Sequence, residues 1–335
     1  MRKKRILSLL LSLVVCIAFM PTAVFADETA GGGTAAGSHK VTVNAGEHGK
    51  VSTDGTNWSD SVEVNVIDNG TLGNAVQYKA DEGYKAGSVT APIVIKKVVA
   101  SATNTAAIDV DGDLYTAGDN GFCQLGRNLE PNKDSDYVLT KVDMRVKITD
   151  VAAGENYIVI LDENGDVWTA GGNYYGQLGR TEYAGNITNS WQGLELEKIA
   201  VGDDSVKIKA VAAGQFHTIL IDENGGVWTA GNNQYGQLGR ATNIGSQKAN
   251  ADFEQASVNG NVKIVAADAG RDHTVLLDEN GDVWTAGYNF FGQLGRGDFS
   301  TNANSTFEKV TAGISDVKMI AVSAGYAHTA ILDQN

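Results

Sequence analysis

The chain is poor in cysteine and proline, and these shortages limit how it can fold. Its 335 residues include two cysteines and three prolines, against forty glycines. Cys16 lies in an N-terminal apolar run, which leaves Cys123 alone in the rest of the chain, so no internal disulfide framework is available. Because no second apolar run follows, the composition predicts a soluble, turn-rich, all-β protein with a packed core.

Basic residues are also scarce. The sequence contains 26 Lys and Arg against 40 Asp and Glu, a formal charge of −14. Phosphate backbones require Lys and Arg, so this acidity argues against nucleic acid as a partner. It favours solubility and repulsion from anionic surfaces.

Residues 1–26 have the pattern of an export signal. A basic cluster at residues 2–5 precedes an apolar run from Ile6 to Met20, and Val24-Phe25-Ala26 ends in the small residue that signal peptidase reads. We predict cleavage after Ala26, an extracellular or cell-surface location, and contact with the membrane only during export. A retained anchor is the alternative, but the run is short for a spanning helix.

Two segments precede the repetitive part of the chain. Residues 27–38, "DETAGGGTAAGS", are small and polar and predict a flexible linker. Residues 39–91 alternate apolar and polar residues at period two between "DNG" and "DEG" turns, which predicts a small β-rich module. Its ending, "ADEGYKAGSVT", resembles small repeat modules of bacterial surface proteins, which implies a spacer or adhesive role.

Residues 92–335 repeat themselves. The residue before each repeated strand recurs at spacings of 53, 60, 56 and 55, namely at Ser101, Gly154, Gly214, Gly270 and Gly325. Each copy contains a strand, a glycine turn, a second strand, an "NG" or "DG" hairpin turn and a return strand such as "GVWTAG". No segment has helical periodicity, so each copy predicts a propeller blade of three to four strands.

The repeated motif "AAGxxHT…LDENGxVWTAGxNxxGQLGR" resembles the repeat of the regulator of chromosome condensation family. The resemblance implies a β-propeller of seven four-stranded blades and a role in protein recognition. The first copy departs from the motif, with Asn104 at the histidine position and Cys123 at a glycine position, and the chain stops in mid-hairpin at "ILDQN". We therefore expect a partial propeller of four repeats and the start of a fifth, with the remaining repeats in a longer protein.

Three sets of residues could carry chemistry, namely three histidines, the acidic turns and Cys123. For each we favour a structural role. His217, His273 and His328 are equivalent residues of different blades, so we expect each imidazole to satisfy backbone groups of its own turn and not to bind a metal. The acidic turns at 109–113, 162–166 and 278–282 lack the calcium-loop order; turn chemistry explains them, with a weak surface calcium site as the alternative.

No catalytic site is predicted. Cys123 has no neighbouring histidine that could activate it as a nucleophile. The sequence also lacks a phosphate loop, a zinc pattern and a nucleophile elbow. We expect no catalytic residue, metal or cofactor and no enzymatic activity; a convergent pair of acids in the central channel would change that view.

The copies differ at a pair of positions before "GQLG", so packing does not dictate these residues. They predict a partner-binding rim, although one aromatic of each pair could instead pack at a blade junction. The candidate binding residues are Phe122, Tyr174, Tyr175, Gln234, Tyr235, Phe290 and Phe291.

The sequence therefore predicts a secreted or cell-surface, non-enzymatic scaffold that binds another protein with a propeller rim. A glycan-binding or wall-associated adhesion module is the alternative. The nuclear nucleotide-exchange role that the family name suggests is rejected at this stage, because of the export signal and the acidity.

Overall fold

The computed structural model describes residues 93–335 apart from 130–133, 186–192, 204, 261, 312 and 314–316, and before residue 93 only 38–44, 49–52, 57, 59, 61–67 and 77–80. The chain divides into two compact units, Met1–Val94 and Ile95–Asn335, three residues from the boundary drawn from the sequence. The predicted export signal and all but Ser38 of the predicted linker lie outside the described residues.

The first unit contains two antiparallel strand pairs. β1 (Ser38–Asn44) pairs with β3 (Ser61–Ile67), with Val41 opposite Val64. β2 (Gly49–Ser52) pairs with β4 (Gln77–Ala80).

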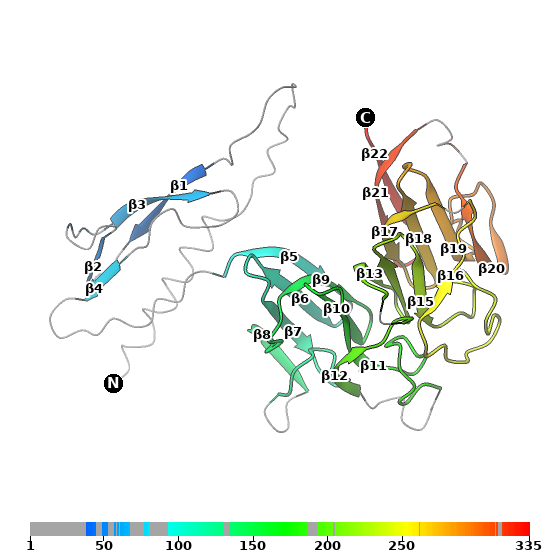
Figure 1. The fold of residues 1–335 in the computed structure, drawn as a ribbon, viewed down its shortest axis with the longest axis horizontal. Helices are drawn as coiled ribbons and strands as arrows, with labels where there is room; N and C mark the ends of the chain where they lie inside the picture. Colours follow the sequence, from blue (N-terminus) through cyan, green and yellow to red (C-terminus); the bar gives the residue numbers. More distant parts are fainter. Residues whose placement is uncertain are drawn as a thin grey trace. The chain divides into compact units, whose positions relative to one another are not determined.

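The second unit consists of four four-stranded antiparallel sheets and a hairpin, arranged one after another along an arc (Figure 1). Blade one contains β5 (Ile95–Ala100), β6 (Asn104–Asp109), β7 (Leu114–Asp119) and β8 (Ser135–Lys141). Blade two contains β9 (Ile148–Ala153), β10 (Tyr157–Asp162), β11 (Val167–Gly172) and β12 (Gly193–Ile199). Blade three contains β13 (Ile208–Ala213), β14 (His217–Asp222), β15 (Val227–Gly231) and β16 (Glu254–Ala256).

Blade four contains β17 (Ile264–Ala269), β18 (His273–Asp278), β19 (Val283–Asn289) and β20 (Ser300–Lys309). The hairpin β21 (Met319–Ala324) and β22 (Thr329–Asp333) begins a fifth blade. The prediction of four repeats and the start of a fifth is confirmed. Among the described residues, no helix has the length and apolarity that crossing a bilayer requires.

In each blade, the aspartate at the start of the hairpin turn accepts hydrogen bonds from the turn and from the return strand. In blade three, Asp222 Oδ1 accepts the backbone N–H of Asn224 at 2.9 Å and of Gly226 at 2.8 Å, while Gly225 takes the left-handed backbone conformation that the turn needs. Asp222 Oδ2 accepts the indole N–H of Trp228 at 2.9 Å. The equivalent pairs in the other blades are Asp109–Tyr115, Asp162–Trp168 and Asp278–Trp284.

The turn interpretation of the acidic segments therefore agrees with the geometry. Their last aspartate is held by lysines: Asp166 pairs with Lys198 and with Lys207, and these contacts lower the pKa of Asp166. Asp113 and Asp282 are paired in the same way. The first and last carboxylates of each turn are thus occupied by partners of the protein itself.

Large side chains fill the junctions between blades. Phe307 is fully buried and lies against Gly239 of the preceding blade, where a Cβ would approach the phenyl ring to 2.0 Å. Phe253 of blade three meets Gly179 of blade two in the same way. The leucines of the repeated "GQLGR", Leu178, Leu238 and Leu294, are each 0 % exposed. The fixed glycines and leucines of the motif are therefore packing positions.

Candidate functional site

Two rims of the propeller have different chemistry. We call one the loop rim; it contains the turns before β10, β14 and β18 (residues 154–156, 214–216 and 270–272) and the loops at 173–178, 233–238 and 289–294. The hairpin rim, at the opposite ends of the same strands, contains the turns at 109–113, 162–166, 222–226 and 278–282. The candidate binding residues belong to the loop rim, which in blade one includes the loop at 120–125.

His217 and His273 link neighbouring blades, which corrects the expectation that each serves its own turn. His217 Nε2 lies 2.9 Å from Thr274 Oγ1 of blade four, and Thr274 donates its own proton to the Gln237 carbonyl of blade three at 2.7 Å. The threonine oxygen is therefore the acceptor, and His217 donates through Nε2. The turn needs no imidazole because Gly214 N–H already donates to the His217 carbonyl at 2.8 Å.

The same link recurs between blade four and the hairpin. His273 Nε2 lies 3.1 Å from Thr329 Oγ1, which donates to the Gln293 carbonyl at 2.7 Å. Burial lowers the pKa of His217 to about 3 and that of His273 to about 4, so both rings are neutral at physiological pH. Tyr157 stands at this position in blade two and donates to the His217 carbonyl at 2.6 Å.

Each aromatic loop is fixed by its repeated residues. Asn173 Oδ1 accepts the Leu178 N–H at 3.0 Å, and Asn173 Nδ2 donates to the Arg180 carbonyl at 2.7 Å. Arg180 in turn donates to the Thr169 carbonyl at 3.0 Å. Equivalent bonds to the leucine N–H are made by Asn120, Asn233 and Asn289. Since these residues hold the backbone, the pair between them is free to vary.

The second member of a pair packs at the blade junction in two of the loops. The ring of Tyr175 lies 5.0 Å from that of Phe216, and Tyr235 lies 4.5 Å from Tyr288, each on the following blade. The Tyr175 carbonyl also accepts the Asn250 N–H at 3.0 Å. The junction alternative therefore describes Tyr175 and Tyr235, both half-buried.

The remaining candidates differ in exposure. Phe290 and Phe291 are 47 % and 68 % exposed and stack edge to face, with centroids 5.0 Å apart. Tyr174 and Gln234 are half-buried. Phe122, also half-buried, lies beside Gly172 of blade two. Partner binding by these residues stays a prediction, with Phe290 and Phe291 the most accessible of the set.

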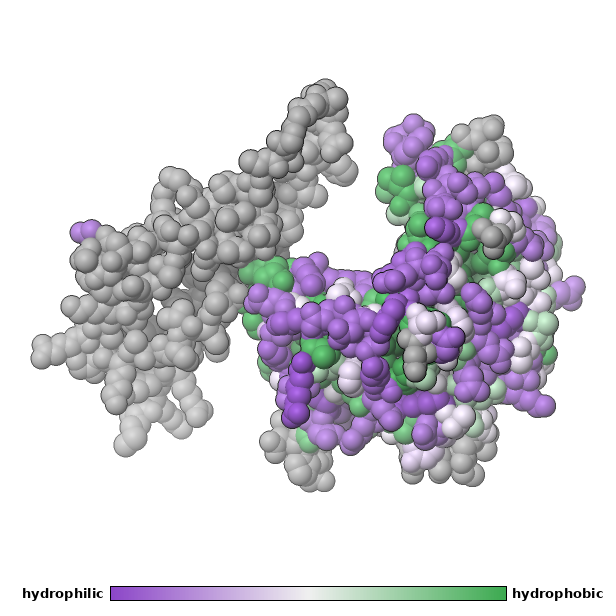
Figure 2. All heavy atoms as spheres, viewed as in Figure 1, coloured by the Kyte–Doolittle hydropathy of each residue, from purple (hydrophilic) through white to green (hydrophobic). Residues whose placement is uncertain are grey.

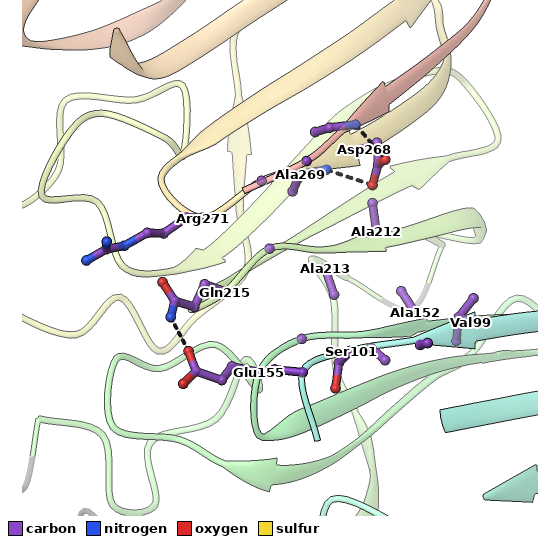
Figure 3. Close-up of a pocket in the computed structure, with 18 of the residues that line it drawn as sticks. Val99, Ser101, Ala152, Glu155, Ala212, Ala213, Gln215, Asp268, Ala269 and Arg271 are labelled. Atoms are coloured by element: carbon purple, nitrogen blue, oxygen red, sulfur yellow. Dashed lines mark hydrogen bonds between the residues drawn. The ribbon is translucent and has the colours of Figure 1, made fainter. Parts of the chain in front are cut away.

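Sequence reasoning missed a second variable set on the loop rim. A groove of about 800 Å³ runs along the inner strands β5, β9, β13, β17 and β21, and its mouth is formed by the residue after each turn glycine. Glu155, Gln215, Arg271 and Tyr326 occupy that position in successive copies, and Figure 3 labels the first three. The sequence signal was available, because these residues change between copies while the glycine before them does not.

Polar contacts join the groove-mouth residues from blade to blade. Gln215 Nε2 donates to the carboxylate of Glu155 (Figure 3). Arg271 pairs with Asp272 at 3.1 Å, and its guanidinium lies 5.2 Å from the ring centroid of Tyr326. Burial raises the pKa of Asp272, with Arg271 opposing the shift. The mouth thus contains four different side chains, which contact one another as two pairs, Glu155 with Gln215 and Arg271 with Tyr326.

The geometry gives no sign of an activated nucleophile. Burial raises the pKa of the Cys123 thiol, which is the opposite of what a nucleophilic cysteine needs. Among the described residues, no three of His, Cys, Asp and Glu lie together in an arrangement that could hold a metal ion. What the loop rim can offer is recognition by exposed aromatic and polar side chains.

The fold and the rim together define a class of protein, a β-propeller built from successive repeats of one blade motif. The Regulator of chromosome condensation (RCC1) repeat matches the chain in two versions, one over residues 148–177, 208–237 and 264–293, the other over 111–161, 224–277 and 280–332. The chain belongs to the Regulator of chromosome condensation repeat family.

Relatives are found in several eukaryotes. The chain is 29 % identical to the Regulator of chromosome condensation of Xenopus laevis, over 79 % of this chain and 60 % of that protein. It is 29 % identical to the Ultraviolet-B receptor UVR8 of Arabidopsis thaliana, over 72 % of this chain and 52 % of the receptor. The chain thus spans between about half and 60 % of the length of these relatives.

Solved structures share the fold. Prp20p of Saccharomyces cerevisiae aligns with a TM-score of 0.63 at 17 % identity, covering 82 % of this chain and 67 % of Prp20p. Human WBSCR16 aligns with a TM-score of 0.61 at 18 % identity, covering 81 % of this chain and 68 % of that protein. At such identities the likeness concerns the propeller architecture alone.

Proposed function

We propose that this protein is a secreted or cell-surface, non-enzymatic scaffold that binds another protein with its loop rim. One observation carries the proposal: residues that most copies share make the turns and blade junctions, whereas two sets of residues that differ between copies lie on the loop rim. Selection for packing explains the first set and leaves the second free for recognition. The surface in Figure 2 is mainly hydrophilic with scattered apolar patches, which favours a partner bound through a few anchor residues.

The relatives support a role in protein recognition. The structure of Prp20p is described together with its binding to Gsp1p and histones, and another structure contains it bound to Kap60. Those partners belong to Prp20p. What carries over in our proposal is the use of a propeller to bind a protein.

A capture experiment tests the use of the loop rim. The full chain would be immobilised and exposed to proteins from its own source, with the double variant F290S/F291S in parallel. Val110→Ser is the matched control, because Val110 is an exposed apolar residue, 39 % accessible, on the hairpin rim. We expect the wild type and the control to retain a protein that the rim variant loses. Equal retention by all three would place binding elsewhere.

The location is tested separately by N-terminal sequencing. The proposal rests on the sequence of residues 1–26 and predicts that protein recovered from the medium or surface begins at Asp27. Mature protein that is retained in the cell and begins at Met1 would contradict export.

Two other functions make distinguishable predictions. A glycan-binding module, suggested by the exposed Phe290–Phe291 pair, would bind a glycan array and lose that binding when one loop is changed. A nucleotide-exchange factor would accelerate nucleotide release from a small GTPase. Our proposal predicts neither effect.

A further inference from the structure

The groove on the inner strands has room because small residues line it. Alanines and glycines of all five copies form most of the wall, among them Ala152, Ala212 and Ala269 (Figure 3). Glu155, Gln215 and Arg271 stand at the mouth, and Asp268 lies further along the wall. A groove of about 800 Å³ can therefore admit a long side chain from a protein bound on the loop rim.

The charges that line the groove do not balance. Its two cations are neutralised by the protein itself, since Lys97 pairs with Asp150 and Arg271 pairs with Asp272. The two lining carboxylates, Glu155 and Asp268, have no Lys or Arg within ion-pair distance in the part of the chain that the structure describes.

Both carboxylates are held in place by neutral donors. Asp268 accepts the backbone N–H groups of Ala269 at 2.9 Å and Ala324 at 2.8 Å, together with the Ser323 hydroxyl at 3.1 Å. Glu155 accepts the amide of Gln215. The groove consequently has an excess of fixed negative charge, and low-dielectric walls strengthen its attraction for a cation.

The mouth also contains an acceptor without a donor. Gln215 Oε1 is buried and has no hydrogen-bond partner among the described residues. Because Gln215 Nε2 is committed to Glu155, the amide oxygen is turned away from that carboxylate, toward Arg271 in Figure 3. An unpaired oxygen in this position is unfavourable, and because it has almost no accessible surface, a donor reaches it only when the half-buried Gln215 side chain turns toward the groove.

We propose that the groove mouth binds an arginine side chain of the protein partner, held between the carboxylate of Glu155 and the amide oxygen of Gln215. This inference rests on the proposed function and names the chemistry of the partner. A guanidinium fits because it carries five N–H donors and one positive charge, so one group satisfies both acceptors. Arg271 does not compete for the site, since its charge is already paired with Asp272 and its guanidinium stacks on Tyr326.

Methyl NMR on the full chain tests the site without a known partner. The protein would carry ¹³C-labelled alanine methyls, and the probe would be N-acetyl-arginine methylamide, with the neutral citrulline analogue as its matched control. We expect saturable shifts at the groove alanines Ala152 and Ala212 and none at Ala230, which is fully buried in β15. Equal shifts with the citrulline analogue, or no shifts at the groove alanines, would overturn the proposal.

Variants that remove one negative charge test whether Glu155 binds the probe. Glu155→Gln keeps the shape of the side chain and should weaken probe binding about fivefold, the size expected for one partly exposed charged contact. Glu279→Gln makes the same charge change on the hairpin rim, where Glu279 is exposed, and should leave binding unchanged. Equal affinity of the wild type and Glu155→Gln, at matched thermal stability, would remove Glu155 from the site.

The experiments distinguish a failure of the arginine site from a failure of the proposed function. If F290S/F291S abolishes capture of a partner while Glu155→Gln changes neither capture nor probe binding, the loop rim is the binding surface and the arginine site is wrong. If Glu155→Gln binds the probe poorly and F290S/F291S captures as the wild type does, the groove is a cation site and the aromatic rim is wrong.

Discussion

The junction between blades three and four and the junction between blades one and two use equivalent positions but differ in their bonds. At the first, His217 donates to Thr274 and Phe307 lies buried against Gly239. At the second, Asn104 and Ile158 replace the histidine and the threonine, and Asn104 Nδ2 is buried without a partner among the described residues.

The smaller Leu196 takes the place of the phenylalanine at the junction of blades one and two, and it is only partly buried beside Gly126. At the junction of blades one and two both partners of the bond change together, whereas between blades two and three Tyr157 replaces the histidine and Thr218 is kept. Where one partner of the histidine–threonine bond is absent in the first copy, the other is absent in the neighbouring copy. A polar group left unpaired in an apolar junction costs stability, whereas removing both partners costs less.

The largest difference between the junctions should lie in their apolar side chains. Phe307→Ala removes a fully buried ring and should lower the free energy of unfolding by about 3–5 kcal/mol. Leu196→Ala at the junction of blades one and two should cost about half as much, because that side chain is only partly buried. Urea unfolding of both variants checks this, and equal losses would contradict the difference.

The next effect is that of the threonine link. Thr274→Val leaves both His217 Nε2 and the Gln237 carbonyl without a partner and should cost about 2 kcal/mol. Thr105 holds the equivalent position in blade one and has no such bond among the described residues, so Thr105→Val is the matched control and should cost under about 0.5 kcal/mol. Thermal unfolding of the two variants measures this difference in stability.

The buried histidines predict how the free energy of unfolding changes with pH. The folded pKa values of His217 and His273, about 3 and about 4, lie below the unfolded value of about 6.5. Between pH 6.5 and pH 4 the unfolded chain therefore binds protons that the folded chain refuses, so stability falls as the pH falls.

A double variant isolates that contribution from the carboxylates. H217Q/H273Q should flatten the dependence of unfolding free energy on pH in this window by about 1 kcal/mol per pH unit for each histidine. Above pH 6.5 the two slopes should coincide. The same slope in both proteins between pH 6.5 and 4 would show that the imidazoles are not buried as neutral rings.

The smallest expected effect is a gain in stability. Asn104→His combined with Ile158→Thr would rebuild at the junction of blades one and two the bond found between blades three and four. We expect the double variant to be about 1 kcal/mol more stable than the sum of the two single variants predicts. A double-mutant cycle measures this coupling, and a value near zero would mean that the junction geometry differs between the copies.

Much of the propeller could be predicted because its rules are local. The Asn224-Gly225 turn, the alternating strands and the glycine spacing predict hairpins wherever they occur. The buried leucines recur at the same place of each "GQLGR". These elements depend on residues close in sequence, so a single copy of the motif was informative.

The histidine link and the groove could not be predicted in the same way. His217 and Thr274 are 57 residues apart, and only the stacking of two blades shows that Nε2 reaches the next blade while the ring lies against Gly214 of its own turn. The groove mouth combines Glu155, Gln215 and Arg271 from three copies. Its variable residues were visible in the sequence, but their convergence depends on the curvature of the arc.

Hydrogen exchange on the complex with a captured partner is the most direct test of the division between packing and recognition. The account predicts that the partner slows exchange in the loop-rim segments 154–156, 173–178, 214–216 and 289–294, while the hairpin-rim turns at 162–166, 222–226 and 278–282 exchange as in the free protein. Slowed exchange confined to the hairpin rim would contradict it.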